Sequence, residues 1–279
     1  MTTRAAATDQ FVTLNGLRFH YRDWPSARPG ARDLVLLHGF TGHAHSWDSF
    51  AAALSAEYRV LALDQRGHGE TEWAKPHEYG VDHMVSDVEA FVAELRLSGF
   101  ALLGLSMGGR NAIHYAGRRP DALERLVIVD IGPEVAAEGS ARIQAGVQAN
   151  DVFASLDEAI DQARRSNPNA DPVEQRHRVA HNLMPAPGGK WTYRYDRALR
   201  DPNNPRPRPA PELGWTLLAS IDVPTLLVRG EVSDVLPRAM AERMAKTIPD
   251  CRLVEVAGSG HSIPLERPRG FLEAVRTFL

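Results

Sequence analysis

Short runs of consecutive apolar residues alternate along the chain with longer stretches in which apolar residues recur every three or four positions. The short runs are typical of strands that are buried on both faces, and the wider spacing is typical of amphipathic helices. The runs predict a hairpin over 11–24 and strands over 33–38, 59–64, 100–105, 125–130, 223–230 and 251–258. The wider spacing predicts helices over 46–58, 81–97, 107–118, 239–248 and 271–279. Because strands alternate with helices, we expect an α/β fold in which helices flank a mostly parallel central sheet.

Residues 134–214 interrupt this alternation. The segment contains helical stretches, but it also contains NPNADP, PAPGG and DPNNPRPRPAPELG, whose prolines are typical of irregular connections rather than buried strands. We therefore expect an inserted, mainly helical cap over 134–214, which lies over a core formed by residues 1–133 and 215–279.

The composition is that of an ordinary globular protein and disfavours several classes of partner. With 279 residues, the chain is long enough for one large domain with an insertion. Its formal net charge of −3 disfavours nucleic acid and anionic membranes as partners, and no apolar stretch reaches the ~18 residues of a membrane span. Cys251 is the only cysteine, which excludes an intramolecular disulfide, and no signal-peptide pattern opens the chain. We expect a cytoplasmic protein that acts on a small molecule as a monomer or a homodimer.

One serine stands between glycines where a predicted strand meets a predicted helix. Residues 104–108 read Gly-Leu-Ser-Met-Gly, a G-x-S-x-G pattern. A serine at such a junction sits on a sharp turn with its hydroxyl exposed above the carboxyl ends of the strands, and the helix that follows favours negative charge beside it. Ser106 is therefore the candidate nucleophile. A glycine-rich turn that serves only for close packing is the alternative.

A serine becomes a nucleophile only beside a base that a carboxylate orients. His261, on the glycine-rich loop after the last predicted strand, is the candidate base. Two aspartates compete as the acid, since Asp130 ends strand 125–130 and Asp234 follows strand 223–230. Both are expected at the carboxyl edge of the sheet, so the pattern leaves both open.

A tetrahedral intermediate needs two N–H groups that stabilise its oxyanion. Met107, the residue after the candidate nucleophile, is expected to supply one. Phe40 is expected to supply the other, because His38-Gly39-Phe40 follows strand 33–38 and its glycine permits a tight bend.

Together these motifs resemble the α/β-hydrolase fold superfamily over most of the chain outside 134–214. The segments that carry the resemblance are LLHGFTG (36–42), WDSF (47–50), DQRGHGET (64–71), GLSMGG (104–109), VRGEVSD (228–234) and GSGHS (258–262). The resemblance implies Ser106 as nucleophile, His261 as base, Phe40 and Met107 as oxyanion donors, and 134–214 as a cap. The mechanism it implies needs no cofactor, and no spacing in the sequence indicates a metal site.

The resemblance also bears on the acid. Most members carry it after the penultimate strand, usually three residues past a glycine, whereas Asp234 stands four residues past Gly230. One branch instead carries a D-[IF]-x-P motif after the strand that follows the serine, and Asp130-Ile131-Gly132-Pro133 is similar to it. We favour Asp130 and keep Asp234 as the alternative.

The expected activity is that of a serine hydrolase, a carboxylic ester hydrolase that cleaves an ester, lactone, thioester or activated amide through an acyl-enzyme intermediate. Three alternatives use the same residues or the same fold: a carbon–carbon bond hydrolase of β-diketone-type substrates, a cofactor-free perhydrolase, and a binding module. Serine at position 106 argues against the dehalogenases and epoxide hydrolases of the superfamily, whose nucleophile is an aspartate.

The cap is expected to set substrate specificity. Trp191 and Tyr193, followed by Tyr195, alternate with polar residues and either line the acyl pocket or pack within the cap. The cap is also rich in arginines. They indicate either a clamp for a carboxylate-bearing substrate or, as we expect for any single one of them, a solvated surface of mixed charge.

Overall fold

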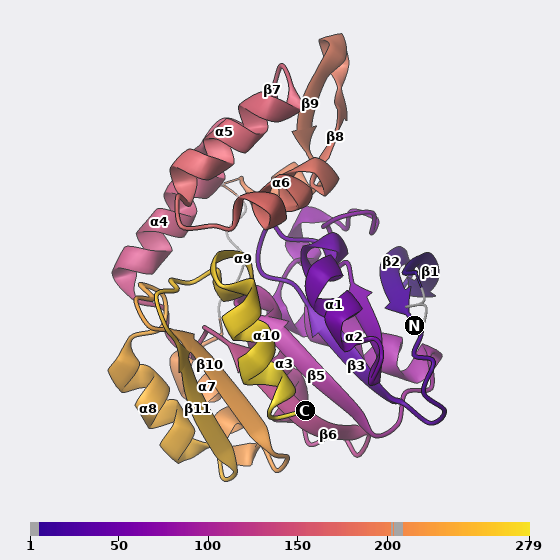
Figure 1. Ribbon diagram of the computed structural model, residues 1–279, viewed down its shortest axis with the longest axis vertical. Coiled ribbons are helices and arrows are strands. Elements are labelled where there is room, and N and C mark those ends of the chain that lie inside the picture. The colour runs from indigo at the N-terminus through magenta and orange to yellow at the C-terminus, as the bar shows by residue number, and fades with distance from the viewer. Residues whose placement is uncertain (1–5, 202, 204–208) are drawn as a thin grey trace.

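The computed structural model describes residues 6–201, 203 and 209–279, and its core is one eight-stranded sheet in the order β1-β2-β4-β3-β5-β6-β10-β11 (Figure 1). The strands are β1 (Thr8–Leu14), β2 (Leu17–Trp24), β3 (Arg32–Leu37), β4 (Tyr58–Leu63), β5 (Phe100–Leu105), β6 (Leu123–Val129), β10 (Thr225–Gly230) and β11 (Cys251–Val256). Strand β2 runs antiparallel to both of its neighbours, and all pairs from β4 to β11 are parallel. This confirms the predicted α/β fold with a mostly parallel sheet.

Helices cover both faces of the sheet, and alternate strand residues pack against them. Leu102 and Ile128 face α2, α3, α7 and α8, whereas Leu103 and Val127 face α1 and α10. The bounds of these helices are α1 (Asp48–Leu54), α2 (Val81–Glu94), α3 (Met107–Ala116), α7 (Pro211–Ser220), α8 (Arg238–Thr247) and α10 (Pro268–Arg276). Because both faces are covered, the strands read as continuous apolar runs.

The segment between β6 and α7 lies beyond one end of the sheet, at the top of the molecule in Figure 1. It contains α4 (Ala137–Gln148), α5 (Leu156–Ser166), α6 (Pro172–His181) and a three-stranded antiparallel sheet of β7 (Val152–Phe153), β9 (Lys190–Tyr193) and β8 (Leu183–Ala186). The expected mainly helical cap therefore also includes a sheet. The alternation of aromatic and polar residues at 191–193 is the two-residue period of a strand.

Some element bounds differ from the sequence prediction. The predicted helix 46–58 is a 3₁₀ turn, η1 (Ala44–Trp47), followed by α1, which ends at Leu54. Helix α7 begins inside the segment expected as cap, yet its Leu218 packs in the core cluster with α3 and α8. The proline-rich stretch before α7 lies partly outside the described residues. The remaining short elements are η2 (Pro76–Glu78), η3 (Pro187–Gly189), η4 (Arg197–Leu199) and α9 (Ile263–Glu266).

None of the helices in the described part of the chain is both long enough and apolar enough to cross a bilayer.

Candidate active site

Ser106 occupies the turn between β5 and α3. Its backbone has φ 53° and ψ −112°, a strained conformation for a residue with a side chain. Two glycines allow this turn. A Cβ on Gly104 would lie 2.2 Å from the carbonyl oxygen of Gly108, and a Cβ on Gly108 would lie 2.4 Å from the carbonyl oxygen of Leu37. Both positions therefore exclude side chains, as the G-x-S-x-G pattern requires.

The Ser106 hydroxyl is hydrogen-bonded to the His261 imidazole. Its Oγ lies 3.0 Å from Nε2 of His261, whose Nδ1 lies 2.8 Å from Oδ2 of Asp130. With Asp130 ionised, Nδ1–H donates to the carboxylate and Nε2 accepts the serine hydroxyl. The structure thus joins three distant segments into one series of hydrogen bonds. Such a series can move a proton from the hydroxyl to the imidazole and stabilise the resulting cation.

Asp130 is fully buried directly after β6, and two further donors hold its carboxylate. The N–H of Gly230 donates to Oδ1 at 2.9 Å, and the hydroxyl of Ser233 donates to Oδ2 at 2.5 Å. Both donors come from the end of β10 and the loop after it. These hydrogen bonds offset the free-energy cost of burying a carboxylate and fix it against the imidazole.

Asp234, the alternative acid, is engaged elsewhere. Its carboxylate accepts two hydrogen bonds from Arg142 of α4, at 2.5 Å from Nε and 2.8 Å from Nη2. This bidentate contact lowers the pKa of Asp234 and ties the cap to the loop after β10. Among the described residues, Asp130 is the aspartate that hydrogen-bonds His261, and Asp234 is not.

The loop after β3 brings Phe40 beside Ser106. A Cβ on Gly39 would lie 3.4 Å from the Cβ of Ser106, so the loop backbone runs directly against the serine. A tight turn closes there, because the N–H of Gly42 donates to the Gly39 carbonyl at 2.9 Å. Met107 begins α3 on the other side of the serine. The structure therefore places both predicted oxyanion donors, Phe40 and Met107, around Ser106, where they line a common cavity with it.

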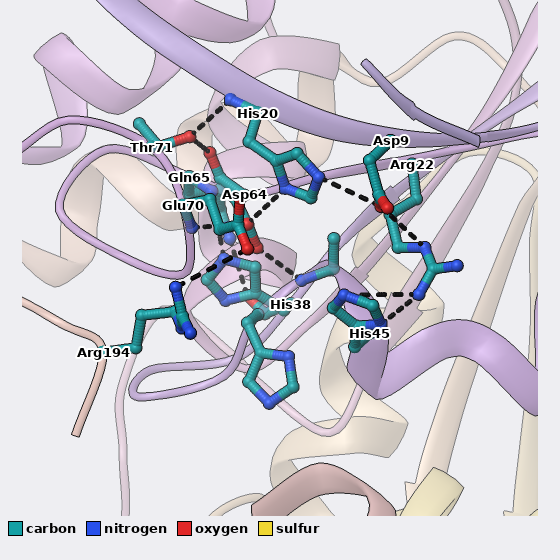
Figure 2. A network of polar contacts seen from close by, with 12 residues as sticks. Asp9, His20, Arg22, His38, His45, Asp64, Gln65, Glu70, Thr71 and Arg194 are labelled. Atoms are coloured by element: carbon teal, nitrogen blue, oxygen red, sulfur yellow. Dashed lines mark hydrogen bonds and ion pairs between the residues drawn. The ribbon is translucent and has the colours of Figure 1, made fainter. Parts of the chain in front are cut away.

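A buried polar network supports this loop (Figure 2). Asp64 accepts hydrogen bonds from the N–H of Ala44 at 2.5 Å and from Nδ1 of His20 at 2.7 Å. Burial raises the pKa of Asp64, but the hydrogen bond and charge of His20 outweigh it and hold that pKa far below its usual value. Gln65 donates from its backbone to Nε2 of His38 at 3.0 Å and from its side chain to the His38 carbonyl at 2.7 Å. The first residues of DQRGHGET thus fix the loop that carries Phe40.

Glu266 of α9 supports the loop that carries His261. Its carboxylate accepts hydrogen bonds from the N–H groups of Gly260 at 2.5 Å and Ser262 at 3.2 Å, the residues on either side of the histidine. Asn167 of the cap donates to the same carboxylate at 3.0 Å. Sequence reasoning missed this residue, because a glutamate in a short C-terminal helix belongs to no motif.

Two adjoining cavities meet at Ser106 beneath the cap. Their volumes are about 530 and 600 Å³, and both are lined by Ser106 and Phe40. Cavities of this size accommodate small organic ligands. Both have mixed polar and apolar linings: the first includes polar residues of the cap, and the second includes the apolar side chains of Met84, Ile131 and Val235.

The two aromatic residues predicted to line the acyl pocket have different positions. Tyr193 lines the first cavity and stacks on Tyr195, with ring centroids 5.4 Å apart. Trp191 lies on β9 with 37% of its surface exposed and lines neither cavity, so of the two expected positions the structure does not give it the one in the pocket. The short β9 strand carries its first residues away from the cleft, which the alternation of residue types does not reveal.

Three histidines gather where α6 meets η1. His45, His177 and His181 each place one ring nitrogen within 4.8 Å of the others, a composition that can hold a transition metal. Here His45 and His177 instead hydrogen-bond to Asp48, at 3.0 and 2.8 Å. Figure 2 shows Arg22 beside His45. Arg22 also pairs with the Asp48 carboxylate at 2.9 Å, and its charge opposes a bound cation. We interpret this cluster as a contact between cap and core.

Comparisons with known proteins agree with this geometry. A family model described as alpha/beta hydrolase fold matches residues 34–268. The chain is 31% identical to the 3-hydroxybutyrate-oligomer hydrolase of Cupriavidus necator, over 91% of this chain and 90% of that protein. It is 30% identical to the N-formylmaleamate deformylase of Pseudomonas putida, over 96% of this chain and 95% of that protein.

Solved structures give the same result for the fold. An alpha/beta hydrolase from Novosphingobium aromaticivorans superposes with a TM-score of 0.86 and 26% identity, covering 98% of both chains. E-2-(acetamidomethylene)succinate hydrolase superposes with a TM-score of 0.88 over 98% of this chain and 99% of that chain. At 22% identity, the second likeness concerns the fold alone.

Proposed function

Because this chain belongs to the α/β-hydrolase fold family and is a hydrolase, we propose that it is a serine hydrolase of small carboxylic esters. In this proposal Ser106 is the nucleophile, His261 the base and Asp130 the acid, and the acyl group is carried on Ser106. The observation that supports it best is the hydrogen-bonded series from Ser106 Oγ through His261 to the buried Asp130.

Acylation begins when Ser106 Oγ bonds to the carbonyl carbon while His261 Nε2 takes the hydroxyl proton. The carbonyl oxygen becomes an oxyanion, to which the N–H groups of Phe40 and Met107 donate. Asp130 stabilises the imidazolium. The imidazolium then gives its proton to the leaving oxygen, the carbon–oxygen bond breaks, and the alcohol departs from an acyl-serine.

Deacylation repeats these steps with water. His261 takes a proton from the water as its oxygen bonds to the acyl carbon, and the same two N–H groups stabilise the second oxyanion. The imidazolium returns the proton to Ser106 Oγ as the acid is released. The same residues also serve for a lactone, a thioester or an activated amide, because only the leaving group differs.

The cavities and the relatives support a small substrate. The two cavities adjoin at Ser106, so they offer separate places for the parts of an ester on either side of the scissile bond. One relative is named as a hydrolase of 3-hydroxybutyrate oligomers and another as a deformylase of N-formylmaleamate. Both names describe derivatives of small organic acids.

Labelling with a fluorophosphonate probe tests the proposal without knowledge of the substrate. We expect the wild-type protein to be labelled at Ser106, as located by peptide mapping, and Ser106→Ala to remain unlabelled. Ser166→Ala is the matched control, because Ser166 lines the same cavity and its hydroxyl, within the described residues, donates to the Gln162 carbonyl and to no catalytic side chain. Labelling at another residue, or none in the folded wild-type protein, would contradict the assignment.

A further inference from the structure

Arg178 of α6 is a cap arginine whose guanidinium has no hydrogen-bond or ion-pair partner among the described residues, which are 6–201, 203 and 209–279. Other cap arginines are paired: Arg142 with Asp234, Arg176 with Asp157, and Arg200 with Asp151.

The Arg178 side chain lines the first cavity together with Ser106. Burial and, in addition, the positive charge of Arg178 lower the pKa of both His38 and His43. Arg178 therefore lies near the loop that carries Phe40, and residues 38–42 of that loop and Tyr193 line the same cavity. This is the part of the cavity next to the proposed oxyanion site.

The backbone at Arg178 is fixed against the core. His43 donates from Nε2 to the Arg178 carbonyl at 2.9 Å, and Asn182 donates from Nδ2 to the Thr41 carbonyl at 3.0 Å. These contacts hold α6 against residues 39–43. The backbone of Arg178 is therefore fixed beside the cavity, so a ligand that uses the guanidinium has only the side chain to order.

The cavity wall leaves this cation uncompensated. Among the described lining residues, Glu174 is the one carboxylate, and it does not pair with Arg178; the second lining arginine, Arg142, is already neutralised by Asp234. Burial lowers the pKa of the Arg178 guanidinium, which is the effect of removing a cation from water without an anion beside it. A ligand carboxylate would offset this cost.

We propose that Arg178 binds a carboxylate of the substrate, so that the preferred substrates are esters that carry a second, ionised carboxyl group. The planar guanidinium matches a carboxylate with two parallel N–H···O hydrogen bonds. The inference rests on the proposed function, because it names the substrate class of the same site. It assigns to one cap residue the selection of anionic over neutral esters.

Two pairs of alkyl esters test the inference by pH-stat assay. Monoethyl succinate and ethyl pentanoate differ by a carboxylate on the acyl side; 3-acetoxypropanoate and butyl acetate differ by one on the alcohol side. We expect the wild-type enzyme to prefer the anionic member of at least one pair. Arg178→Met should lower kcat/KM for that anionic ester by about 10- to 100-fold, which corresponds to the loss of a charged hydrogen bond. It should lower kcat/KM for the neutral counterpart by less than about threefold. Arg178→Lys, which keeps the charge without the fork, should lie between them.

Matched controls separate this result from a loss of structure. Arg176→Met removes a cation from the same helix, where Arg176 pairs with Asp157 at 3.3 Å, and should leave the preference unchanged. Succinate binding to Ser106→Ala, measured by calorimetry, should disappear when Arg178→Met is added. The inference would be overturned if the wild-type enzyme preferred the anionic ester in neither pair, or if Arg178→Met lowered kcat/KM equally for both members of a pair. Normal turnover of the neutral esters would still leave the proposed function standing. If no ester is turned over and Ser106 is not labelled, the proposed function fails, and succinate binding alone decides the role of Arg178.

Discussion

Ser106 and Asp130 end neighbouring parallel strands, β5 and β6, and both do so with a positive φ, of 53° and 50°. Residues with side chains rarely adopt this conformation, which costs on the order of 1 kcal/mol or more at each position. These two turns place Ser106 Oγ within hydrogen-bond distance of one ring nitrogen of His261 and Asp130 Oδ2 within hydrogen-bond distance of the other. Strain of this kind persists where surrounding contacts impose it, which is typical of functional sites.

We expect Ser106→Ala to lower kcat by about four to six orders of magnitude, because the variant lacks the atom that carries the acyl group. The melting temperature should change little, since the side chain is small and makes one hydrogen bond within the described residues. The measurement is turnover of an ester that the wild-type enzyme cleaves, alongside thermal unfolding. Residual turnover within a factor of about ten of wild type would exclude Ser106 as the nucleophile.

The two aspartates should respond differently to the same substitution. Asp130→Asn should lower kcat by about 10³- to 10⁴-fold, because an amide neither fixes the imidazole tautomer nor stabilises its cation. Asp234→Asn should cost less than about tenfold, since it loosens only the contact with Arg142 on the partly exposed surface. Both are measured as kcat on one ester. Equal, mild losses would show that neither aspartate orients His261.

Two glycine substitutions should change the free energy of unfolding in opposite directions. Gly108→Ala should destabilise the protein by more than about 3 kcal/mol or prevent folding, because the new Cβ would lie 2.4 Å from a backbone oxygen that cannot easily move. Gly146→Ala, in helix α4, meets no atom within 4 Å and should stabilise by about 0.5–1 kcal/mol. Urea unfolding of both variants checks this, and a stable Gly108→Ala protein would contradict the described elbow.

Because of Asp64, the free energy of unfolding should decrease at acid pH. Its pKa is depressed in the folded state, so its ionised form stabilises the protein above the ordinary value of 3.8, and this contribution is lost as the pH falls below that value. Asp64→Asn should flatten the acid limb of the stability curve and cost about 3–5 kcal/mol near neutral pH, since it removes the buried carboxylate beside His20 and leaves the exposed Asp9 as the acidic partner of that ring. Urea unfolding between pH 3 and 7 tests both effects. Parallel acid limbs in the two proteins would mean that Asp64 does not titrate as described.

Glu266→Gln should slow catalysis by misplacing His261. An amide has one acceptor oxygen in place of two, and its N–H₂ group opposes the N–H groups of Gly260 and Ser262. We expect kcat to fall by about 10- to 100-fold with KM changing less, and the rate of fluorophosphonate labelling to fall in parallel. A change in KM alone, or in thermal stability alone, would assign the residue a different role.

The parts of the site that the sequence predicts are those encoded in contiguous motifs. Ser106, His261, Phe40 and Met107 each stand in a short pattern at the end of a predicted strand, and parallel strands bring such ends to one edge. The choice between the two candidate acids required the three-dimensional structure, because Asp130 and Asp234 follow adjacent strands and differ only in the groups that surround them.

The residues that sequence reasoning did not find or did not single out depend on contacts between distant segments. Glu266 acts on the backbone of a loop, and no residue type marks that task. The sequence includes Arg178 among several cap arginines that form either a carboxylate clamp or a solvated surface, and only the lack of a partner within the described residues singles it out. The misplacement of Trp191 has the same origin, since alternation predicts a strand but not the direction in which its residues face the rest of the molecule.

The loop after β10 still reaches the acid, through Gly230 and Ser233, although the carboxylate itself directly follows β6. Since β6 and β10 are parallel neighbours, a carboxylate at the end of either strand is within range of the same imidazole. The position of the acid is therefore open to evolutionary relocation: an ancestor could hold carboxylates on both strands and lose either one without an inactive intermediate. A Ser233→Asp change in an Asp130→Asn background would retrace that route in the laboratory.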